Sequence, residues 1–190
     1  ISKNTSTGAI TTLSSINSSG ITSFDANTMP VEAGTGITGG TGTIYRSSVQ
    51  RVGGIITTRI LIDLTGLRST ASGDIIGVNG TSNVCHIGQI TAARNGTILT
   101  GSMECFEAPA GGDPDINVHS ATEGTGVEDG AISSLTETLL VNAGDATLGS
   151  KVYFTAVPAA DEFLYLTLGD TTDADYTAGK LFIELMGYEA

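Results

Sequence analysis

The sequence predicts an all-β protein, specifically an antiparallel β-sandwich of the jelly-roll-like kind, preceded by an extended Gly/Ser/Thr-rich N-terminal arm. Glycine supplies 26 of the 190 residues, roughly twice its average share of about 7%. Charged residues make up 15% of the chain, against a usual figure of about 25%. Thr, Ile and Val suit pleated strands and Gly suits turns, whereas residues that stabilise exposed helices are scarce.

The N-terminal arm is predicted over residues 1–43, which hold 24 Ser, Thr or Gly residues and only three charged ones. Isolated apolar residues are spaced through it, among them Ile10, Leu13, Ile16 and Phe24. Ser and Thr neighbours disfavour a stable helix there. Two interpretations stay open. The segment is either a flexible tail or an arm that becomes ordered on a partner, with these apolar residues as anchors.

The β-sandwich domain is predicted over residues 44–190. Its strongest β-branched run covers 52–64. The apolar runs that predict further strands are 74–78, 84–92, 97–106, 132–141, 151–157, 163–168 and 181–188. Turn signals such as Asn79-Gly80 and Asn95-Gly96 separate these runs. Short strands at this spacing are typical of a sandwich, although a closed barrel fits the same pattern.

A long surface loop is predicted between the strands, over residues 108–130. It holds acidic residues around Glu123 and Glu128-Asp129, after the rigid Asp113-Pro114 step. It has few large apolar side chains to bury.

The two cysteines, Cys85 and Cys105, are too few for a disulfide framework. If Asn95-Gly96 is a two-residue hairpin turn, Cys85 opposes Phe106, and Cys105 opposes His86. Side chains alternate between the faces of a sheet, so this register places the sulfurs on opposite sides and predicts two free thiols. A Cys105/His86 nucleophile pair is formally possible, but no orienting carboxylate or oxyanion site is marked.

Charge is unevenly distributed along the chain. The formal net charge is −12, with six basic and four acidic residues in 1–100 and two basic and sixteen acidic residues in 101–190. Four basic residues lie where the arm meets the first strong strand: Arg46, Arg51, Arg59 and Arg68. An acidic body repels phosphate backbones, so we do not expect nucleic-acid binding.

Membrane insertion and nucleotide binding are not expected either. No stretch approaches the roughly eighteen consecutive apolar residues of a membrane-spanning helix. The Gly-rich segments lack the lysine of a phosphate-binding loop. We therefore expect neither a cofactor nor an enzyme.

Two groups of residues could in principle bind a metal ion. His119 lies near Asp113, Asp115 and Glu123, but the spacing matches no closed ligand set. An acidic, solvated loop explains that group as well.

The second group is a weak calcium candidate formed by Asp170, Asp173 and Asp175, three carboxylates close together in one turn. Calcium prefers oxygen ligands, but the full EF-hand pattern is absent. The alternative is a hairpin loop that its charges keep soluble.

The C-terminal segment carries a resemblance to a known class of protein. Its elements are the strand 164–168, the tetrapeptide Thr177-Ala178-Gly179-Lys180 after a Thr/Asp-rich turn, and the terminal strand 181–188 that ends in Gly-Tyr. This arrangement resembles the end of small virion structural proteins of tailed phages, especially marine podovirus-like phages. The resemblance implies a place on the capsid surface, with the major capsid protein and copies of the chain itself as partners.

The first functional hypothesis is a capsid decoration or cement protein, acting as an oligomer. Its partner-binding residues would be the apolar anchors of the arm and the four arginines named above. The alternatives are a receptor- or glycan-binding module of a phage fibre, using Tyr176, Asp173 and His119, and a jelly-roll capsid subunit. Aromatic residues are only 5% and Trp is absent, which argues against sugar stacking.

Overall fold

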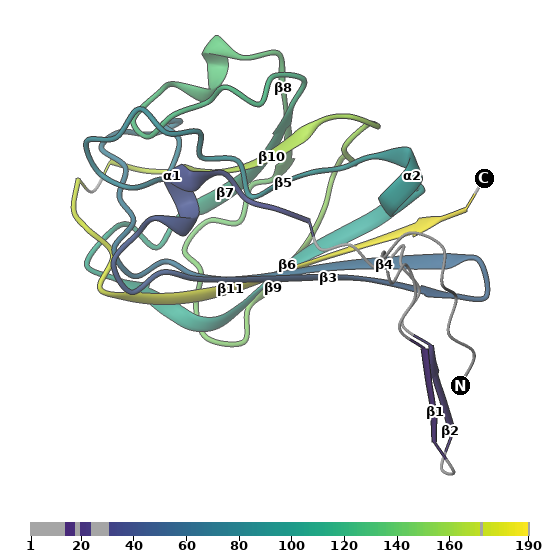
Figure 1. Cartoon of the computed structure of the whole chain (residues 1–190). Helices are drawn as coiled ribbons and strands as arrows, with labels where there is room; N and C mark the ends of the chain where they lie inside the picture. Colours follow the sequence, from purple (N-terminus) through teal and green to yellow (C-terminus); the bar gives the residue numbers. More distant parts are fainter. Residues whose placement is uncertain (1–13, 18–19, 24–30, 172, 190) are drawn as a thin grey trace, which may run out of the picture.

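Two antiparallel sheets form the body of the protein (Figure 1), which confirms the all-β prediction. The computed structural model describes the backbone of residues 14–17, 20–23, 31–171 and 173–189, and the side chains of the last two ranges. The larger sheet has the strand order β3-β4-β11-β6-β9. Its strands are β3 (Ile44–Val52), β4 (Ile55–Asp63), β6 (Thr97–Ala110), β9 (Lys151–Tyr153) and β11 (Ala178–Tyr188).

The first two strands of this sheet form a tight hairpin. The run 52–64 is therefore not one strand but the end of β3, a turn and the whole of β4. Gly53 and Gly54 form the turn with φ of 58° and 83°. Two successive positive φ values match the type I′ turn, whose twist suits a two-residue hairpin and which Gly adopts without strain.

Strand β11 is the centre of the larger sheet, with β4 on one side and β6 on the other. Its side chains alternate, and Leu181, Ile183 and Leu185 are fully buried. The intervening residues, such as Phe182 and Glu184, lie on the opposite face and are partly exposed. This period of two buries one face of the sheet and leaves the other open.

The smaller sheet lies over the buried face and has the order β5-β10-β7-β8 (Figure 1). Strand β10 (Phe163–Leu168) has the predicted bounds. The others are β5 (Gly88–Gln89), β7 (Ile116–Ala121) and β8 (Glu137–Val141). Leu164, Leu166 and Val118 belong to the same core cluster as Ile183 and Ile60 of the larger sheet. The two sheets therefore share one core.

The prediction of a surface loop over 108–130 is wrong. Strand β6 continues to Ala110, and β7 runs through the middle of the stretch, fully paired with β10. Ile116, Val118 and Ala121 have no exposed surface. Sequence reasoning missed β7 because its apolar residues are few and its neighbours, including His119 and Ser120, are polar although buried.

The predicted hairpin turn at Asn95-Gly96 is also wrong. Residues Ala92–Asn95 form the short helix α2, capped by the Thr91 side chain. Cys85 therefore does not oppose Phe106, and Cys105 pairs with Leu181 rather than His86. Both cysteines are nevertheless free, as predicted, and both are buried.

Several predicted strands are shorter than their apolar runs. Of 84–92, only β5 is a strand, and of 151–157, only β9. The run 74–78 forms only isolated bridges. The run 132–141 begins with the 3₁₀ helix η1 (Ile132–Ser134) before β8. Outside the short strands, these runs follow irregular backbone although they contain apolar residues, so apolar content alone overestimates their strand length.

Part of the predicted arm packs against the body. The Gly-rich run 34–42 contains the one-turn helix α1 (Thr35–Thr38), and Val31 and Ile37 are buried. Before it, β1 (Ser14–Asn17) and β2 (Gly20–Ser23) form a separate two-stranded sheet. Among the residues that the structure describes, no helix has the length and apolar content to cross a membrane.

Asn95 offers a test of how α2 is held against the sheet. Its side chain is fully buried, donates to the Thr58 hydroxyl at 2.7 Å and accepts from the Thr91 N–H at 2.9 Å. Asn95→Ala removes both hydrogen bonds and leaves the Thr58 hydroxyl and the Thr91 N–H without this partner. We therefore expect a loss of about 1–3 kcal/mol in the free energy of unfolding. Urea unfolding measures this. The exposed Asn83→Ala is the control and should change little; equal effects would contradict the assignment.

Candidate functional site

The open face of the larger sheet is the candidate functional site. We call it the outer face; it is formed by the side chains that alternate with the core residues of β3, β4, β11, β6 and β9. In Figure 1 no described part of the body covers it. Its apolar residues and those at its ends include Ile44, Val52, Ile55, Leu61, Phe106, Tyr153, Phe182, Met186 and Tyr188.

Several aromatic side chains lie on this outer face. Phe106 and Phe182 stack with ring centroids 5.1 Å apart and an interplanar angle of 9°. Phe106 is 48% exposed and Tyr153 is 67% exposed. The Lys151 ammonium lies 5.8 Å from the centroid of the Tyr153 ring. Exposed aromatic residues of this kind are enriched where proteins bind other proteins.

Ion pairs connect neighbouring strands across the outer face. Arg59 Nε lies 2.8 Å from Glu184 Oε2, and Lys151 Nζ lies 3.5 Å from Glu104 Oε2. Lys180 lies 3.5 Å from Asp63 Oδ2 and also contacts Glu107. The Glu107 hydrogen bond raises the pKa of Lys180. Exposed pairs contribute only about 0–1 kcal/mol each to stability, so their main effect is to balance the charge of this face.

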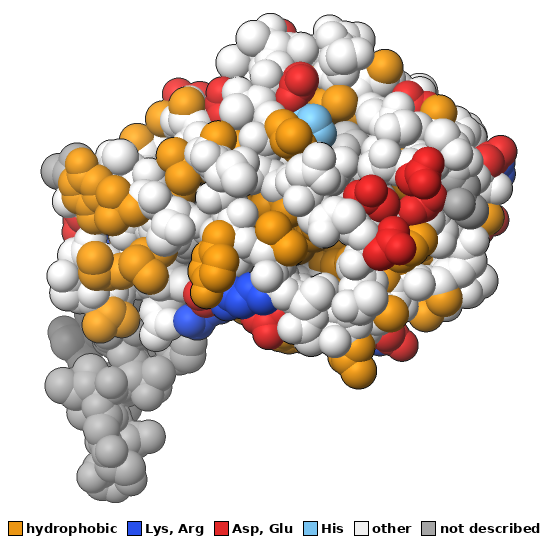
Figure 2. Space-filling model, turned by 180° about the vertical axis from the view of Figure 1, so that it is seen from behind, with side chains coloured by type: hydrophobic (Ala, Val, Ile, Leu, Met, Phe, Trp, Pro, Cys, Tyr) orange, Lys and Arg blue, Asp and Glu red, His pale blue; other side chains and the backbone are white. Residues whose placement is uncertain are grey.

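The outer face is consequently close to neutral in a strongly acidic protein. Its four basic residues are balanced by four carboxylates. The basic residues are Arg46, Arg59, Lys151 and Lys180, and the carboxylates are Asp63, Glu104, Glu107 and Glu184. The rest of the chain carries the net charge of −12. Figure 2 shows another view of the molecule, in which several acidic side chains gather at the right-hand side.

The four predicted docking arginines do not form one patch. Arg46 and Arg59 lie on the outer face. Arg59 pairs with Ser48 of β3, and Arg46 is two positions from Ser48, so its side chain points to the same side of the sheet. Arg51 is five positions from Arg46 in the same strand and therefore lies on the other face. It pairs with Glu189 at 2.9 Å. Arg68 lies in the segment after β4, where its backbone pairs with Gly77.

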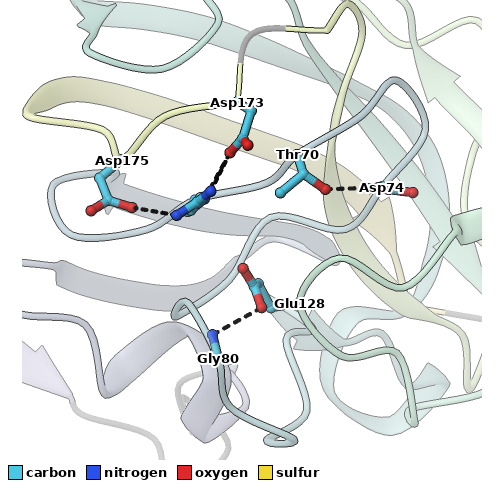
Figure 3. Close-up of polar contacts among 7 residues, drawn as sticks. Thr70, Asp74, Gly80, Glu128, Asp173 and Asp175 are labelled. Carbon is cyan, nitrogen blue, oxygen red and sulfur yellow. Dashed lines mark hydrogen bonds and ion pairs between the residues drawn. The ribbon is translucent and has the colours of Figure 1, made fainter.

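Arg68 contacts two carboxylates, those of Asp173 and Asp175, both labelled in Figure 3. Its guanidinium donates two hydrogen bonds to Asp173 Oδ1 and lies 3.9 Å from Asp175 Oδ1. These contacts raise the pKa of Arg68. Asp173 and Asp175, two of the three calcium candidates, are thus occupied by an arginine of the same chain.

The third calcium candidate, Asp170, accepts a hydrogen bond from the Thr171 hydroxyl at 3.3 Å. Within the described ranges, no group of three or more His, Cys, Asp or Glu side chains is arranged to hold a metal ion. The geometry therefore does not support the calcium interpretation or the metal group around His119.

Glu128 is a buried carboxyl group near Arg68 and its two partners Asp173 and Asp175 (Figure 3). It is 8% exposed, and its Oε2 accepts from the Gly80 N–H at 3.1 Å. Burial raises its pKa, with a further contribution from the neighbouring Asp129 charge. Burial and Asp129 also raise the pKa of Asp74. No sequence signal distinguishes Glu128 from its exposed neighbours.

The two histidines are held by packing and by one side-chain hydrogen bond. His119 Nδ1 lies 2.7 Å from Glu137 Oε2, a pairing between β7 and β8 that the sequence did not indicate. Ser120 follows His119 in the strand and points to the opposite face, so the two do not form a nucleophile pair. The His86 ring lies against the Phe163 ring in a tilted arrangement, with centroids 5.0 Å apart and an interplanar angle of 57°. Burial lowers the pKa of His86.

The cysteines are in environments that disfavour the thiolate. Burial raises the pKa of Cys85 to about 12 and also raises that of Cys105. Because the thiolate is the nucleophile, such buried thiols are unreactive at neutral pH.

The residues predicted to contact sugar do not converge on one site. Tyr176 is buried, and its hydroxyl donates to the Asp113 carbonyl at 2.8 Å. Asp173 binds Arg68 and His119 pairs with Glu137. Of the arm anchors, Ile10, Leu13 and Phe24 lie outside the described residues. Ile16 lies in β1, where it is the backbone partner of Ile21.

Comparisons with protein-family models, with curated proteins and with solved structures found no match for this chain. The resemblance of the C-terminal segment to phage virion proteins therefore stays a prediction.

The buried carboxyl of Glu128 predicts a pH dependence. Because its folded pKa is raised above the ordinary value of 4.5, the folded state binds more protons, and this site loses stability as pH rises from that value through the folded pKa. Glu128→Gln keeps an acceptor for Gly80 without the charge. We expect it to raise the free energy of unfolding by about 1 kcal/mol at pH 7, and by less at pH 4.

Urea unfolding of both proteins at the two pH values checks this expectation. Glu162→Gln is the matched control. The Glu162 carboxylate also accepts a backbone hydrogen bond, from the Ala159 N–H at 2.9 Å, but it lies in an exposed turn. A Glu128→Gln effect that is the same at pH 4 and pH 7 would contradict the burial argument.

Proposed function

We propose that the protein is a virion structural protein of the capsid decoration or cement type, located on the capsid surface and bound to the major capsid protein. The finer form of the fold that we propose with it is a jelly-roll-like β-sandwich with an extended N-terminal arm. The observation that carries the proposal is the outer face: an open, nearly neutral sheet surface with exposed aromatic residues on an otherwise acidic protein.

The composition of the outer face favours a protein partner. A protein interface combines an apolar centre with a polar rim and aromatic contacts. Phe106, Phe182 and Leu61 supply apolar area, and the ion pairs of Arg59 and Lys180 lie among them. A nucleic-acid partner would need an excess of basic residues, whereas on this face every Lys has a carboxylate beside it.

The N-terminal segment and the arginines have separate parts in this proposal. Arg46 and Arg59 lie on the outer face and position the partner. Ile10, Leu13, Ile16 and Phe24 provide apolar anchors if the segment becomes ordered against neighbouring capsid subunits, which would offset its conformational entropy. The glycan-binding alternative loses support because its residues are held by partners within the chain.

The first test is cosedimentation of the purified protein with tailed-phage capsids stripped of accessory proteins, across a salt series. A glycan array serves as the control. Saturating, stoichiometric capsid binding is the expected result. Specific sugar recognition without capsid binding would replace the proposal with the fibre-module alternative.

Phe106→Asp tests whether the outer face makes the contact. Placing a charge among the aromatic residues should weaken capsid binding by on the order of tenfold, the scale of a central interface residue. Leu148→Asp is the matched control, since Leu148 is 74% exposed but lies outside the strands of the sheet. Equal binding by the two variants in the same cosedimentation assay would rule out the outer face as the docking surface.

Deletion of residues 1–30 tests the contribution of the N-terminal segment. The deletion should end there, because Val31 and Ile37 are buried in the body. We expect an unchanged unfolding transition, measured by circular dichroism, together with weaker capsid binding. Full binding by the shortened chain would remove the segment from the proposal and leave the outer face alone.

A further inference from the structure

The edges of the two sheets are protected unequally. The edge strands β5, β9 and β8 have only two, three and five residues, and the pairing of β8 shifts in register at His119. Strand β3 is an edge strand of nine residues, paired with β4 without any shift. Proteins usually shorten or interrupt an exposed edge because its unpaired backbone groups can bind another strand.

The backbone groups of β3 that face this free edge can be assigned from the ladder. Glu189 donates its N–H to the Gly54 carbonyl at 3.0 Å, so the even-numbered positions at that end of β4 bond towards β11. The odd-numbered positions of β4 then bond towards the even-numbered residues of β3. The outward-pointing N–H and C=O groups are those of Tyr45, Ser47, Val49 and Arg51. Of these, the Tyr45 carbonyl accepts a hydrogen bond from the Arg46 guanidinium at 2.8 Å, which an added strand would replace. Within the described ranges, β3 pairs with β4 alone.

We propose that β3 is a self-association edge, where a second copy of the chain adds its own β3 in antiparallel orientation around a two-fold axis through Ser48. This is the centre at which all nine residues of both strands are paired. It places Tyr45 opposite Arg51 and Ser47 opposite Val49, which are the four outward-bonding positions. The two larger sheets then continue into one another, with both outer faces on the same side.

The side chains agree with this register. Arg46 lies opposite Gln50, and Ile44 lies opposite Val52, so no like charges face each other. A register centred on Arg46 or Arg51 would place two arginines directly opposite, which is unfavourable. The two-fold symmetry also matches the commonest form of homodimer, in which one surface is complementary to itself.

A groove lies at the end of β3 that holds Tyr45 and Ser47, between this strand and residues 31–33. It has a volume of about 450 Å³ and is lined by Val31, Glu32, Ala33, Thr38, Tyr45, Arg46 and Ser47. Strand addition commonly combines backbone pairing with such space for alternate side chains.

Salt should strengthen this association. Each chain has a net charge of −12, so two copies repel each other at long range, and added salt screens that repulsion. Sedimentation equilibrium of the isolated protein at 50 mM and 500 mM NaCl should show a mass twice 19.3 kDa, with a lower dissociation constant at the higher salt. A monomer at all concentrations and both salts overturns the proposal.

Cysteine cross-linking tests the register. Ser48→Cys places two thiols at a non-hydrogen-bonded pair on the axis, where Cβ atoms are roughly 4.5–5.5 Å apart, within reach of a disulfide. The native Cys85 and Cys105 are 0% and 2% exposed and do not compete. Thr57→Cys is the control, because Thr57 lies on the same face but in β4, one strand further from the edge.

Mild oxidation should convert most of the Ser48→Cys protein to a covalent dimer on a non-reducing gel and little of the Thr57→Cys protein. Equal cross-linking of the two, or none, would falsify the pairing even if the wild type is a dimer.

Charge substitutions at Gln50 test the same register, because Gln50 lies opposite Arg46 of the second copy. Gln50→Glu should lower the dissociation constant of the dimer and Gln50→Lys should raise it, each on the order of tenfold. If the two Gln50 substitutions do not change the dissociation constant in opposite directions, the proposed register is also wrong. These measurements need no capsid and are independent of the proposed function.

Discussion

The alternation of side chains in the larger sheet is the constraint on which the rest of the structure depends. The inward residues of β4 and β11, such as Ile60 and Ile183, meet the smaller sheet, and each fully buried side chain of this size contributes about 1.5–3 kcal/mol. The same alternation directs the remaining side chains to the outer face. A shift of one residue in the pairing would exchange the two sets, so the core fixes which aromatic residues and charges are exposed.

This division gives the molecule separate surfaces. The outer face combines balanced ion pairs with stacked Phe106 and Phe182, whereas acidic groups near Arg68 lie in the segments that follow β4 and precede β11. The long edge at β3 borders the outer face, so pairing of two copies there would double one continuous surface without covering it. Self-association and partner docking are therefore compatible in a single arrangement.

Sequence reasoning succeeded where side chains carry a strong local signal. Strand β11 follows apolar alternation, and its residues are buried as that pattern requires, whereas β10 is a short apolar run buried over almost its whole length. It failed at β7, where His119 and Ser120 are buried by long-range pairing, and at Asn95-Gly96, where a turn signal hides a capped helix whose Asn side chain bonds Thr58. Glu128 and the ion pairs of Arg68 depend on contacts between distant segments, which no local pattern reveals.

The central position of β11 has a consequence for biosynthesis. This strand joins β4 to β6, yet residues 178–188 are translated more than sixty residues after the last residue of β6. The sheet cannot close while they are still inside the ribosome, so the earlier strands remain unpaired on one side until these residues emerge. Such long-range pairing folds slowly, and a nascent chain that stalls before β11 would expose its apolar strands to aggregation and to proteases.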